Sequence, residues 1–296
     1  MNKGMLSALS AYLLWGVLPI FFKQLQHVPP LEILSHRAMW SFLLLFTVLA
    51  LRKELKGFFL KVKEPKILLT FLISASLLAT NWLVYIWAVT NGHIVDASLG
   101  YFINPLINVL LGMIFLKERL RRGQAVAILI AAFGVAYLAF SYGVIWWIGL
   151  VLGFSFGFYA LLRKTAPLGS FDGLSLEIMC LILPGLGYLF YLHSTNAGLY
   201  GQADLMTTFL LTCTGLVTVG PLLFFAYGAQ RITMTTLGIL QYIAPTLQFL
   251  VGVLLYGELF TPARLIGFSI IWGALVIYTL ESVIHARART KELVLS

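Results

Sequence analysis

Charged side chains are scarce in this sequence. Asp, Glu, Lys and Arg make up 10% of the 296 residues, while hydrophobic residues make up 60%. A soluble domain carries about a quarter charged residues because it needs a hydrated surface. The scarcity argues against a soluble globular fold, and it predicts a chain whose solvent is the lipid bilayer.

Several motifs are also missing. The sequence has no G-x4-G-K-[ST], H-E-x-x-H or G-x-S-x-G run and no paired carboxylates, so neither direct use of ATP nor enzyme chemistry is indicated. The two cysteines, Cys180 and Cys213, lie in separate apolar runs, so they form no C-x-x-C motif. The net charge of +9 comes from short loops between apolar runs. We therefore expect no cofactor, no metal and no nucleic-acid partner.

Ten apolar runs have the length of about 20 residues that a helix needs to cross a bilayer. The predicted spans are 4–23, 31–51, 67–90, 96–116, 123–140, 144–162, 173–192, 206–229, 234–256 and 263–281. The sequence therefore predicts an all-α integral membrane protein with ten transmembrane helices.

The positions of Lys and Arg predict the orientation. With a cytoplasmic N-terminus, 17 of the 20 fall on the cytoplasmic side, Lys23 and Arg264 fall on the opposite side, and Arg37 lies within a span. Positive charge collects on the cytoplasmic side of inner-membrane proteins. We expect a multi-pass protein of the bacterial inner membrane with both termini in the cytoplasm.

The chain contains an internal repeat. The pattern P-x6-G-x5-E occurs at Pro105 and again at Pro245, and the stretch 88–100 aligns without a gap onto 226–238. Each half holds five spans, and because five is odd the second half enters the membrane from the opposite side. The sequence predicts two inverted five-helix repeats, residues 1–142 and residues 143–296, the second ending in a short basic tail. Inverted repeats are a common design of secondary transporters.

The sequence resembles the RarD-type permeases of the EamA group, in the drug/metabolite transporter superfamily, over essentially its whole length. The resemblance rests on WGVLPIFFK (Trp15–Lys23), EILSHRAMWS (Glu32–Ser41), and the paired LKERL and YGELF segments. It implies ten helices, a central cavity between the halves, and export of small metabolites or drugs. Amino-acid-like and amphenicol-like substrates both stay open.

Two prolines near the middle of matching spans predict where a substrate binds. Pro105 and Pro245 each remove a backbone donor, so we expect helix kinks at both. Polar side chains flank each proline on one helix face, because positions seven residues apart share a face. The predicted substrate cavity is lined by Tyr101, Asn104, Asn108, Gln241 and Gln248, with Asn81 and Trp82 as further members. Hydrogen bonding between helices is the alternative role for these amides.

A few ionisable residues lie within or beside spans, where charge is costly and often functional. Arg37 is a candidate for binding a substrate carboxylate or for pairing with Glu32, which requires the helix to bend. His36 and Glu177 are candidates for proton coupling, which the sequence leaves open. The matching pair Glu118 and Glu258 are gate candidates, with simple surface salt bridges as the alternative.

The sequence therefore predicts a secondary transporter, a permease or exporter that works by alternating access. Its expected partners are the lipid bilayer, a small-molecule substrate and, if coupled, protons. A non-transporting membrane scaffold and a facilitated-diffusion channel remain as alternatives.

Overall fold

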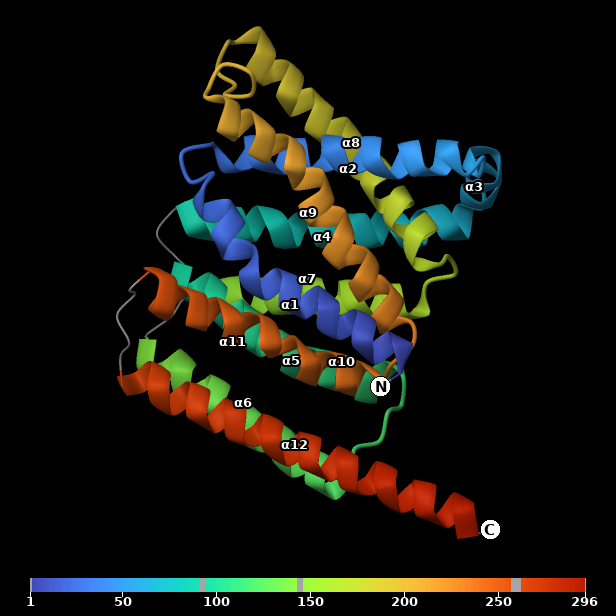
Figure 1. Ribbon diagram of the computed structural model, residues 1–296, viewed down its shortest axis with the longest axis vertical. Helices are drawn as coiled ribbons and strands as arrows, with labels where there is room; N and C mark the ends of the chain where they lie inside the picture. The colour runs from blue at the N-terminus through green and yellow to red at the C-terminus, as the bar shows by residue number, and fades with distance from the viewer. Residues whose placement is uncertain (1, 91–93, 143–145, 257–261, 296) are drawn as a thin grey trace.

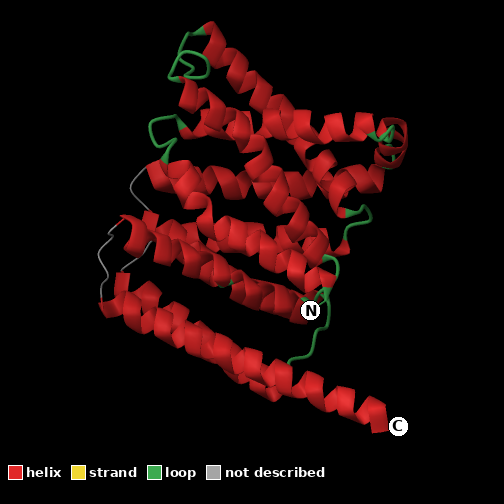
Figure 2. Ribbon diagram, in the orientation of Figure 1, coloured by secondary structure: helices red, strands yellow, loops and turns green. Residues whose placement is uncertain are grey.

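The computed structural model describes residues 2–90, 94–142, 146–256 and 262–295. Helices run between two ends of the molecule, and both termini lie at the same end (Figure 1). Helices and loops, without strands, make up these residues (Figure 2). The predicted all-α class is confirmed.

The helices follow the predicted spans closely. The first half contains α1 (Lys3–Lys23), α2 (Pro30–Leu51), α4 (Pro65–Thr90), α5 (Ile94–Phe115) and α6 (Arg122–Tyr142). The second half contains α7 (Trp146–Thr165), α8 (Ser170–Ser194), α9 (Leu205–Ala229), α10 (Met234–Gln241), α11 (Ile243–Leu250) and α12 (Pro262–Leu295). Within the described ranges, nine segments are long and apolar enough to span a membrane, and Gly100–Phe115 is a shorter apolar helix.

The structure departs from the prediction in four places. A short amphipathic helix, α3 (Leu55–Val62), lies between the second and third spans and was not predicted. The predicted span 234–256 is divided into α10, α11 and a π-helical turn, Val251–Leu255. Arg163 belongs to α7 and is fully buried, although its charge suggested a loop. The basic tail continues α12 as helix to Leu295.

Short polar side chains start several helices. Asn2 accepts a hydrogen bond from Gly4 N (3.0 Å) at the start of α1, and Asp204 accepts one from Thr207 N (2.8 Å) at the start of α9. The hydrogen bonds from Thr207 lower the pKa of Asp204 below its ordinary value. These caps lie at the membrane ends of the helices, where the first backbone N–H groups lack partners.

Packing occurs mainly between the two halves. The contacts form three matched pairs: replacing each span by its counterpart in the other half turns one contact of a pair into the other. The pairs are α1–α9 with α4–α7, α5–α7 with α1–α11, and α2–α9 with α4–α8. Three further contacts, α2–α8, α5–α10 and α6–α12, join corresponding spans directly. The inverted repeat itself stays a prediction, and this pattern of contacts is compatible with it.

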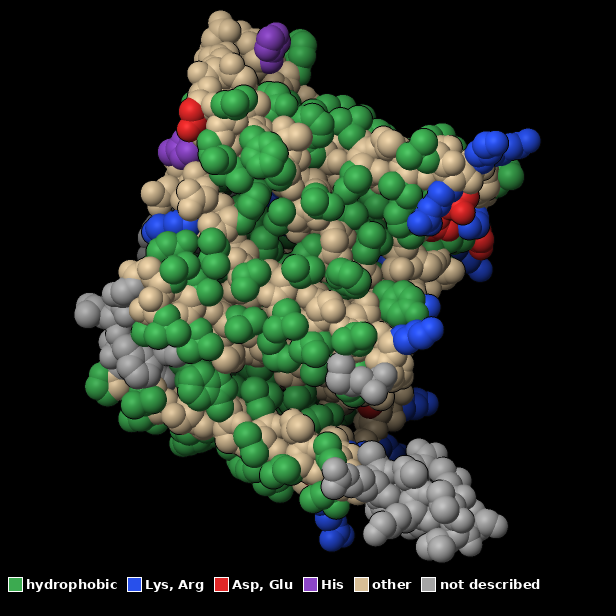
Figure 3. All heavy atoms as spheres, in the orientation of Figure 1, with side chains coloured by type: hydrophobic (Ala, Val, Ile, Leu, Met, Phe, Trp, Pro, Cys, Tyr) green, Lys and Arg blue, Asp and Glu red, His purple; other side chains and the backbone are tan. Residues whose placement is uncertain are grey.

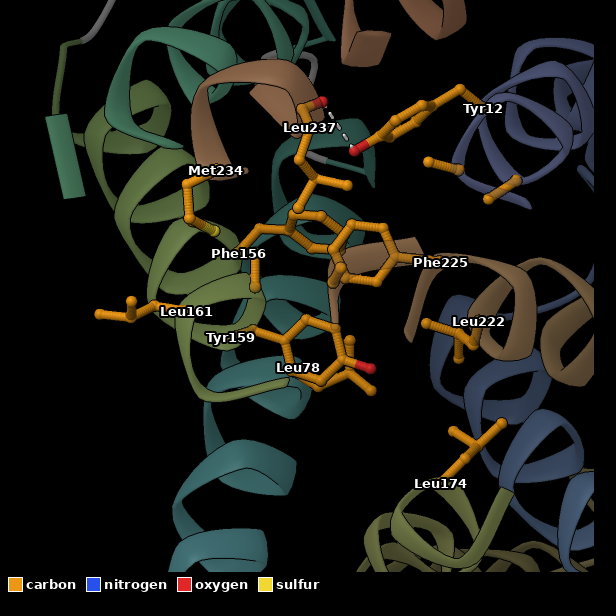
Figure 4. Close-up of a cluster of buried hydrophobic side chains, with 14 of the residues drawn as sticks. Tyr12, Leu78, Phe156, Tyr159, Leu161, Leu174, Leu222, Phe225, Met234 and Leu237 are labelled. Carbon is orange, nitrogen blue, oxygen red and sulfur yellow. Dashed lines mark hydrogen bonds between the residues drawn. The ribbon is translucent and has the colours of Figure 1, made fainter. Parts of the chain in front are cut away.

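An aromatic cluster fills the centre of the bundle, where α1, α7, α9 and α10 meet (Figure 4). Phe156 and Tyr159 of α7 lie 5.2 and 5.9 Å from Phe225 of α9 between ring centroids. The Tyr12 hydroxyl donates to the Leu237 carbonyl of α10 (3.1 Å), as the dashed line in Figure 4 shows. Large rings with a satisfied hydroxyl hold the halves together in the interior.

The outer surface is apolar around the middle of the bundle. Leu183, Phe190 and Leu216 are 77%, 74% and 65% exposed, which suits contact with lipid tails. Figure 3 shows hydrophobic side chains over the middle of one face and most of the visible Lys and Arg along one edge. We call the end of the bundle formed by 52–66, 116–122, 163–169 and 230–233 the basic face.

Gly215 permits the close approach of α9 to α2, and it yields a test of the packing. A Cβ at Gly215 would lie 2.6 Å from the backbone carbonyl carbon of Trp40 and 2.8 Å from its oxygen. We expect Gly215→Ala to lower the free energy of unfolding by about 1–3 kcal/mol, because the backbones must separate. Thermal denaturation in detergent, followed by circular dichroism, measures this loss.

Gly220 of the same helix provides the control, because a Cβ there meets no described atom within 4 Å. We expect Gly220→Ala to leave the unfolding midpoint unchanged or to raise it slightly, since Ala favours helix over Gly by up to about 1 kcal/mol. Equal midpoints for the two variants would contradict the packing of α9 on α2.

Candidate functional site

Helices α5 and α10 touch at the centre of the bundle, where the two halves meet. A Cβ added to Gly238 would lie 2.5 Å from the Pro105 carbonyl oxygen, so the two backbones are in contact. Three residues after Pro105, Asn108 Nδ2 donates to Gln241 Oε1 at 2.7 Å. Both amides are buried. The structure therefore joins two predicted site residues, one from each half.

The second helix is interrupted at this point. Helix α10 ends at Gln241 and α11 begins at Ile243, so Pro245 lies in the first turn of α11, where a missing N–H is tolerated. The Gln241 carbonyl thus has no donor four residues later. In contrast, α5 is continuous through Pro105. The interruption is one residue long, because Tyr242 keeps dihedral angles of the right-handed helical region.

The other predicted amides lie near this crossing but bind elsewhere. Gln248 Nε2 donates to the Trp15 carbonyl (3.0 Å), and Asn81 Nδ2 donates to the Leu152 carbonyl (2.9 Å) and to Ser155 Oγ (3.0 Å). These bonds connect α11 to α1 and α4 to α7. Asn81 and Gln248 therefore bond helices together in this structure, and the cavity role remains a prediction.

Some polar atoms at the crossing have no partner in the described part of the chain. They are Asn104 Oδ1, Asn108 Oδ1 and the Tyr242 hydroxyl, all buried. Buried polar atoms are nearly always hydrogen-bonded, so unpaired ones call for an explanation such as water, a ligand or another conformation.

Arg37 of α2 contacts side chains of α1, α4 and α9. Its Nε donates to Thr218 Oγ1 of α9 (2.9 Å), and its Cζ lies 4.3 Å from the ring centroid of Trp82 and 5.5 Å from that of Phe22. The guanidinium thus rests on aromatic rings and hydrogen-bonds to a neutral hydroxyl. The structure brings two predicted residues, Arg37 and Trp82, into contact.

Glu32 and His36 contact the connection between α8 and α9 instead of Arg37. Glu32 Oε1 accepts from the backbone N–H groups of Leu199 (2.7 Å) and Tyr200 (3.1 Å). The His36 ring lies 4.6 Å from the Tyr200 ring. The suggested pairing of Glu32 with Arg37 does not form in this structure: Oε1 accepts from the backbone, Arg37 donates to Thr218, and Glu32 Oε2 has no partner among the described residues.

Glu177 lies in a buried polar cluster. Its carboxylate accepts from Ser74 Oγ (2.5 Å) and from the Tyr159 hydroxyl (3.4 Å), and it lies 3.7 Å from Arg163 Nη1. Arg163 and Glu177 are both fully buried. The cluster joins α4 of the first half to α7 and α8 of the second. A charge in the interior of a membrane protein requires such a partner.

Glu118 caps the start of α10 on the basic face. Its carboxylate accepts from Met234 N (2.7 Å), Thr235 N (2.9 Å) and Thr235 Oγ1 (2.8 Å). A carboxylate at a helix N-terminus satisfies free N–H groups and interacts favourably with the helix dipole. Glu118 thus ties the end of α5 to α10, whereas Glu258 lies outside the described residues.

The local backbone explains why Glu118 reaches α10. Lys117 adopts a left-handed conformation (φ 54°), and Glu118 N donates to the Gly112 carbonyl (3.0 Å), which closes the end of α5. A Cβ at Gly112 would lie 2.9 Å from Glu118 Oε2 and 2.8 Å from Met234 Cβ. Each residue of the first P-x6-G-x5-E pattern therefore lies against α10, Pro105 at Gly238 and the other two at the start of the helix.

Exposed ion pairs also lie on the basic face. Lys61 Nζ binds Asp172 Oδ2 at 2.7 Å, and this hydrogen bond raises the pKa of Lys61 above its ordinary value. Arg121 Nε binds Glu281 Oε1 at 2.6 Å, and the hydrogen bond likewise raises the pKa of Arg121. Surface pairs of this kind contribute little to stability. No group of three or more His, Cys, Asp or Glu comes together as a metal site in the described ranges.

Sequence reasoning missed two residues of these contacts. Arg163 follows an apolar run and was counted with the loop charges; its burial depends on the partner Glu177, which lies 14 positions away. The contact of Thr218 could not be predicted from the sequence. A single Thr in an apolar helix is common, and its hydroxyl often donates to a carbonyl of its own helix.

The EamA-like transporter family model matches residues 2–140 of the chain. A relative described as an uncharacterized transporter, from Vibrio cholerae serotype O1, is 43% identical over 292 residues, covering 98% of this chain and 97% of its own. Protein RarD of Escherichia coli K12 is 40% identical over 290 residues, covering 98% of each.

A solved crystal structure of a protein has the same fold. Its TM-score is 0.71 at 18% sequence identity, and the superposition covers 94% of this chain and 98% of that chain. At this identity, the likeness concerns the fold alone.

The buried pair of Arg163 and Glu177 yields a stability test. We expect Arg163→Met to lower the free energy of unfolding by about 3–5 kcal/mol, because it leaves a buried carboxylate without its counter-charge. The double variant Arg163→Met/Glu177→Gln removes that charge, so we expect it to recover part of the loss. Thermal denaturation of both variants in detergent measures the coupling.

Lys61→Met is the matched control, because it breaks an exposed ion pair that joins α3 to α8. We expect a loss of less than about 1 kcal/mol. A double variant no more stable than Arg163→Met would show that the two charges do not stabilise each other.

Proposed function

The chain belongs to the EamA-like transporter family, in its RarD-type group, and we propose that it is a secondary transporter that moves small metabolites or drugs across the inner membrane by alternating access. The hydrogen bond between Asn108 and Gln241 carries this proposal. It links the two halves where one helix is broken, beside buried polar atoms that lack partners.

Alternating access needs two arrangements of similar energy. The exchanged contacts between halves support this, because a structure whose halves resemble each other can adopt a second, mirrored arrangement at little cost. The unpaired atoms Asn104 Oδ1 and Asn108 Oδ1 gain partners from substrate, water or the second arrangement. The proposal places the substrate at the crossing of α5 and α10.

In this proposal the basic face is cytoplasmic, and the contact of Glu118 with α10 closes that side. Lys164 Nζ supports the closure by donating to the carbonyls of Ala229 (3.3 Å) and Ile232. The ends of α5, α7 and α10 are then held together on one face. Proton coupling through Glu177 or His36 stays a prediction from the sequence, and the proposal does not depend on it.

Counterflow in proteoliposomes tests transport. Proteoliposomes that contain the purified protein are loaded with unlabelled solutes. Uptake of labelled amino acids, nucleosides, amphenicols and small organic acids is then measured. We expect saturable counterflow that falls by about tenfold or more in Asn108→Ala, because Gln241 is left unpaired at a cost of about 1–3 kcal/mol. We expect a comparable loss in Gln248→Ala.

Gln124→Ala provides the control for a lost buried amide, because Gln124 bonds to the Tyr278 hydroxyl (3.2 Å) between α6 and α12, away from the crossing. We expect it to keep wild-type counterflow. Normal counterflow in both Asn108→Ala and Gln248→Ala would contradict the assignment of the substrate site. If the folded wild-type protein shows no counterflow of any solute in the panel, a scaffold is favoured over a transporter.

The closure at Glu118 is tested separately by cysteine accessibility. In a background lacking Cys180 and Cys213, a cysteine at Asn108 reports access from the basic face to a membrane-impermeant maleimide. We expect Glu118→Ala to speed labelling about fivefold, the effect of a cap worth about 1 kcal/mol. Glu281→Gln, which breaks an ion pair on the same face, should leave the rate unchanged; an equal effect of both variants would contradict the closure.

A further inference from the structure

Arg37, which is half-buried, differs from the fully buried Arg163 in what neutralises its charge. Arg163 lies 3.7 Å from the Glu177 carboxylate. Arg37 has one hydrogen-bond partner among the described residues, the hydroxyl of Thr218, and no carboxylate within ion-pair distance there. Glu32, the nearest acidic residue along α2, is occupied by the backbone N–H groups of Leu199 and Tyr200.

The position of Arg37 makes this lack costly. It lies seven residues after the start of α2, about 10 Å along the helix. A guanidinium at such a depth normally pairs with a protein carboxylate or marks a substrate pathway. Because the guanidinium keeps its charge, an anion from outside the described residues would supply the negative charge that it lacks.

Aromatic side chains surround the guanidinium on one side. Trp82 and Phe22 lie within 5.5 Å of Arg37 Cζ, and Tyr85 and Tyr101 lie in the neighbourhood of the guanidinium. The Tyr85 and Tyr101 rings pack edge to face at 5.6 Å. Such rings accept the flat apolar body of a ligand whose charged end meets the guanidinium.

The site also includes Tyr101 of α5, the helix that forms one side of the crossing on which the proposed function depends. Tyr101 precedes Pro105 by four residues, so its carbonyl lacks the helical donor that the proline removes. Thr218 belongs to the second half, and the other members belong to the first. A ligand bound by Arg37 would therefore contact the interface of the halves.

We propose that Arg37, with Phe22, Trp82, Tyr85 and Tyr101, forms the binding site for monoanionic organic carboxylates that carry an apolar or aromatic body, a proposal that rests on the transport function above. The planar guanidinium binds a carboxylate through two parallel hydrogen bonds. No carboxylate among the described residues lies at ion-pair distance to hold the ammonium group of a zwitterion beside it. The site therefore favours simple carboxylates over amino acids.

The test compares three probes of one shape: 3-phenylpropionate, 3-phenylpropionamide and phenylalanine. Equilibrium binding to the purified full-length protein in nanodiscs is measured by titration calorimetry, without reference to flux. We expect 3-phenylpropionate to bind about tenfold or more tightly than the amide and than phenylalanine. In Arg37→Gln, we expect its affinity to fall to that of the amide, while the amide's own affinity is unchanged.

Arg52→Gln is the matched control, because Arg52 follows the same helix and also lies over an aromatic ring, Phe171, at 5.4 Å. We expect it to bind all three probes as the wild type does. Equal affinity for the anion and the amide, no measurable binding of the anion, or unchanged anion binding in Arg37→Gln would each overturn the proposal.

Counterflow separates the two proposals. Binding of 3-phenylpropionate that depends on Arg37, with no counterflow of any solute, would support the anion site and contradict transport. Counterflow of neutral solutes that is unchanged in Arg37→Gln, together with equal binding of anion and amide, would support transport and contradict the anion site.

Discussion

The carboxylate of Glu118 at the N-terminus of α10 is the contact on which the arrangement of the two halves depends. The first N–H groups of a helix have no partner within the helix and need one from elsewhere. Glu118 satisfies those of Met234 and Thr235, and Gly112 leaves the space for it. This fixes α10 against α5 and sets Gly238 on the Pro105 carbonyl, which in turn aligns Asn108 with Gln241.

The cost of charge in an apolar interior distinguishes the fully buried Arg163 from the half-buried Arg37. Arg163 and Glu177 neutralise each other between α4, α7 and α8, and Ser74 and Tyr159 satisfy the carboxylate further. That cluster is complete in charge, so it suits a structural role. Arg37 has a hydroxyl and aromatic rings but no internal anion among the described residues. The protein supplies a carboxylate to Arg163 and none among the described residues to Arg37, so the Arg37 guanidinium can bind an anionic ligand.

The fold could be predicted from the sequence to a large extent, because lipid imposes one strong requirement on length and polarity. The positions of the ten spans follow from it. The repeated pattern P-x6-G-x5-E indicated that Pro105, Gly112 and Glu118 share a role, but it did not indicate which role. All three contact α10, which lies more than a hundred residues further along the chain. For the same reason Arg163 was placed in a loop, since only Glu177 makes its burial tolerable. The periodicity of apolar residues indicates which residues face the interior. It does not indicate which polar groups form hydrogen bonds or ion pairs with one another.

The position of Arg37 links substrate binding to the movement of the halves. Its hydrogen bond to Thr218 crosses from α2 to α9, so the guanidinium is shared between the first half and the second. A carboxylate that binds side-on through Nε and one Nη competes with the Thr218 hydroxyl for the Nε–H donor. In the proposed site, side-on binding of an anion would therefore weaken one contact between the halves. A ligand can shift a conformational equilibrium only through such a difference in contacts between states, and the exchange at Arg37 provides one.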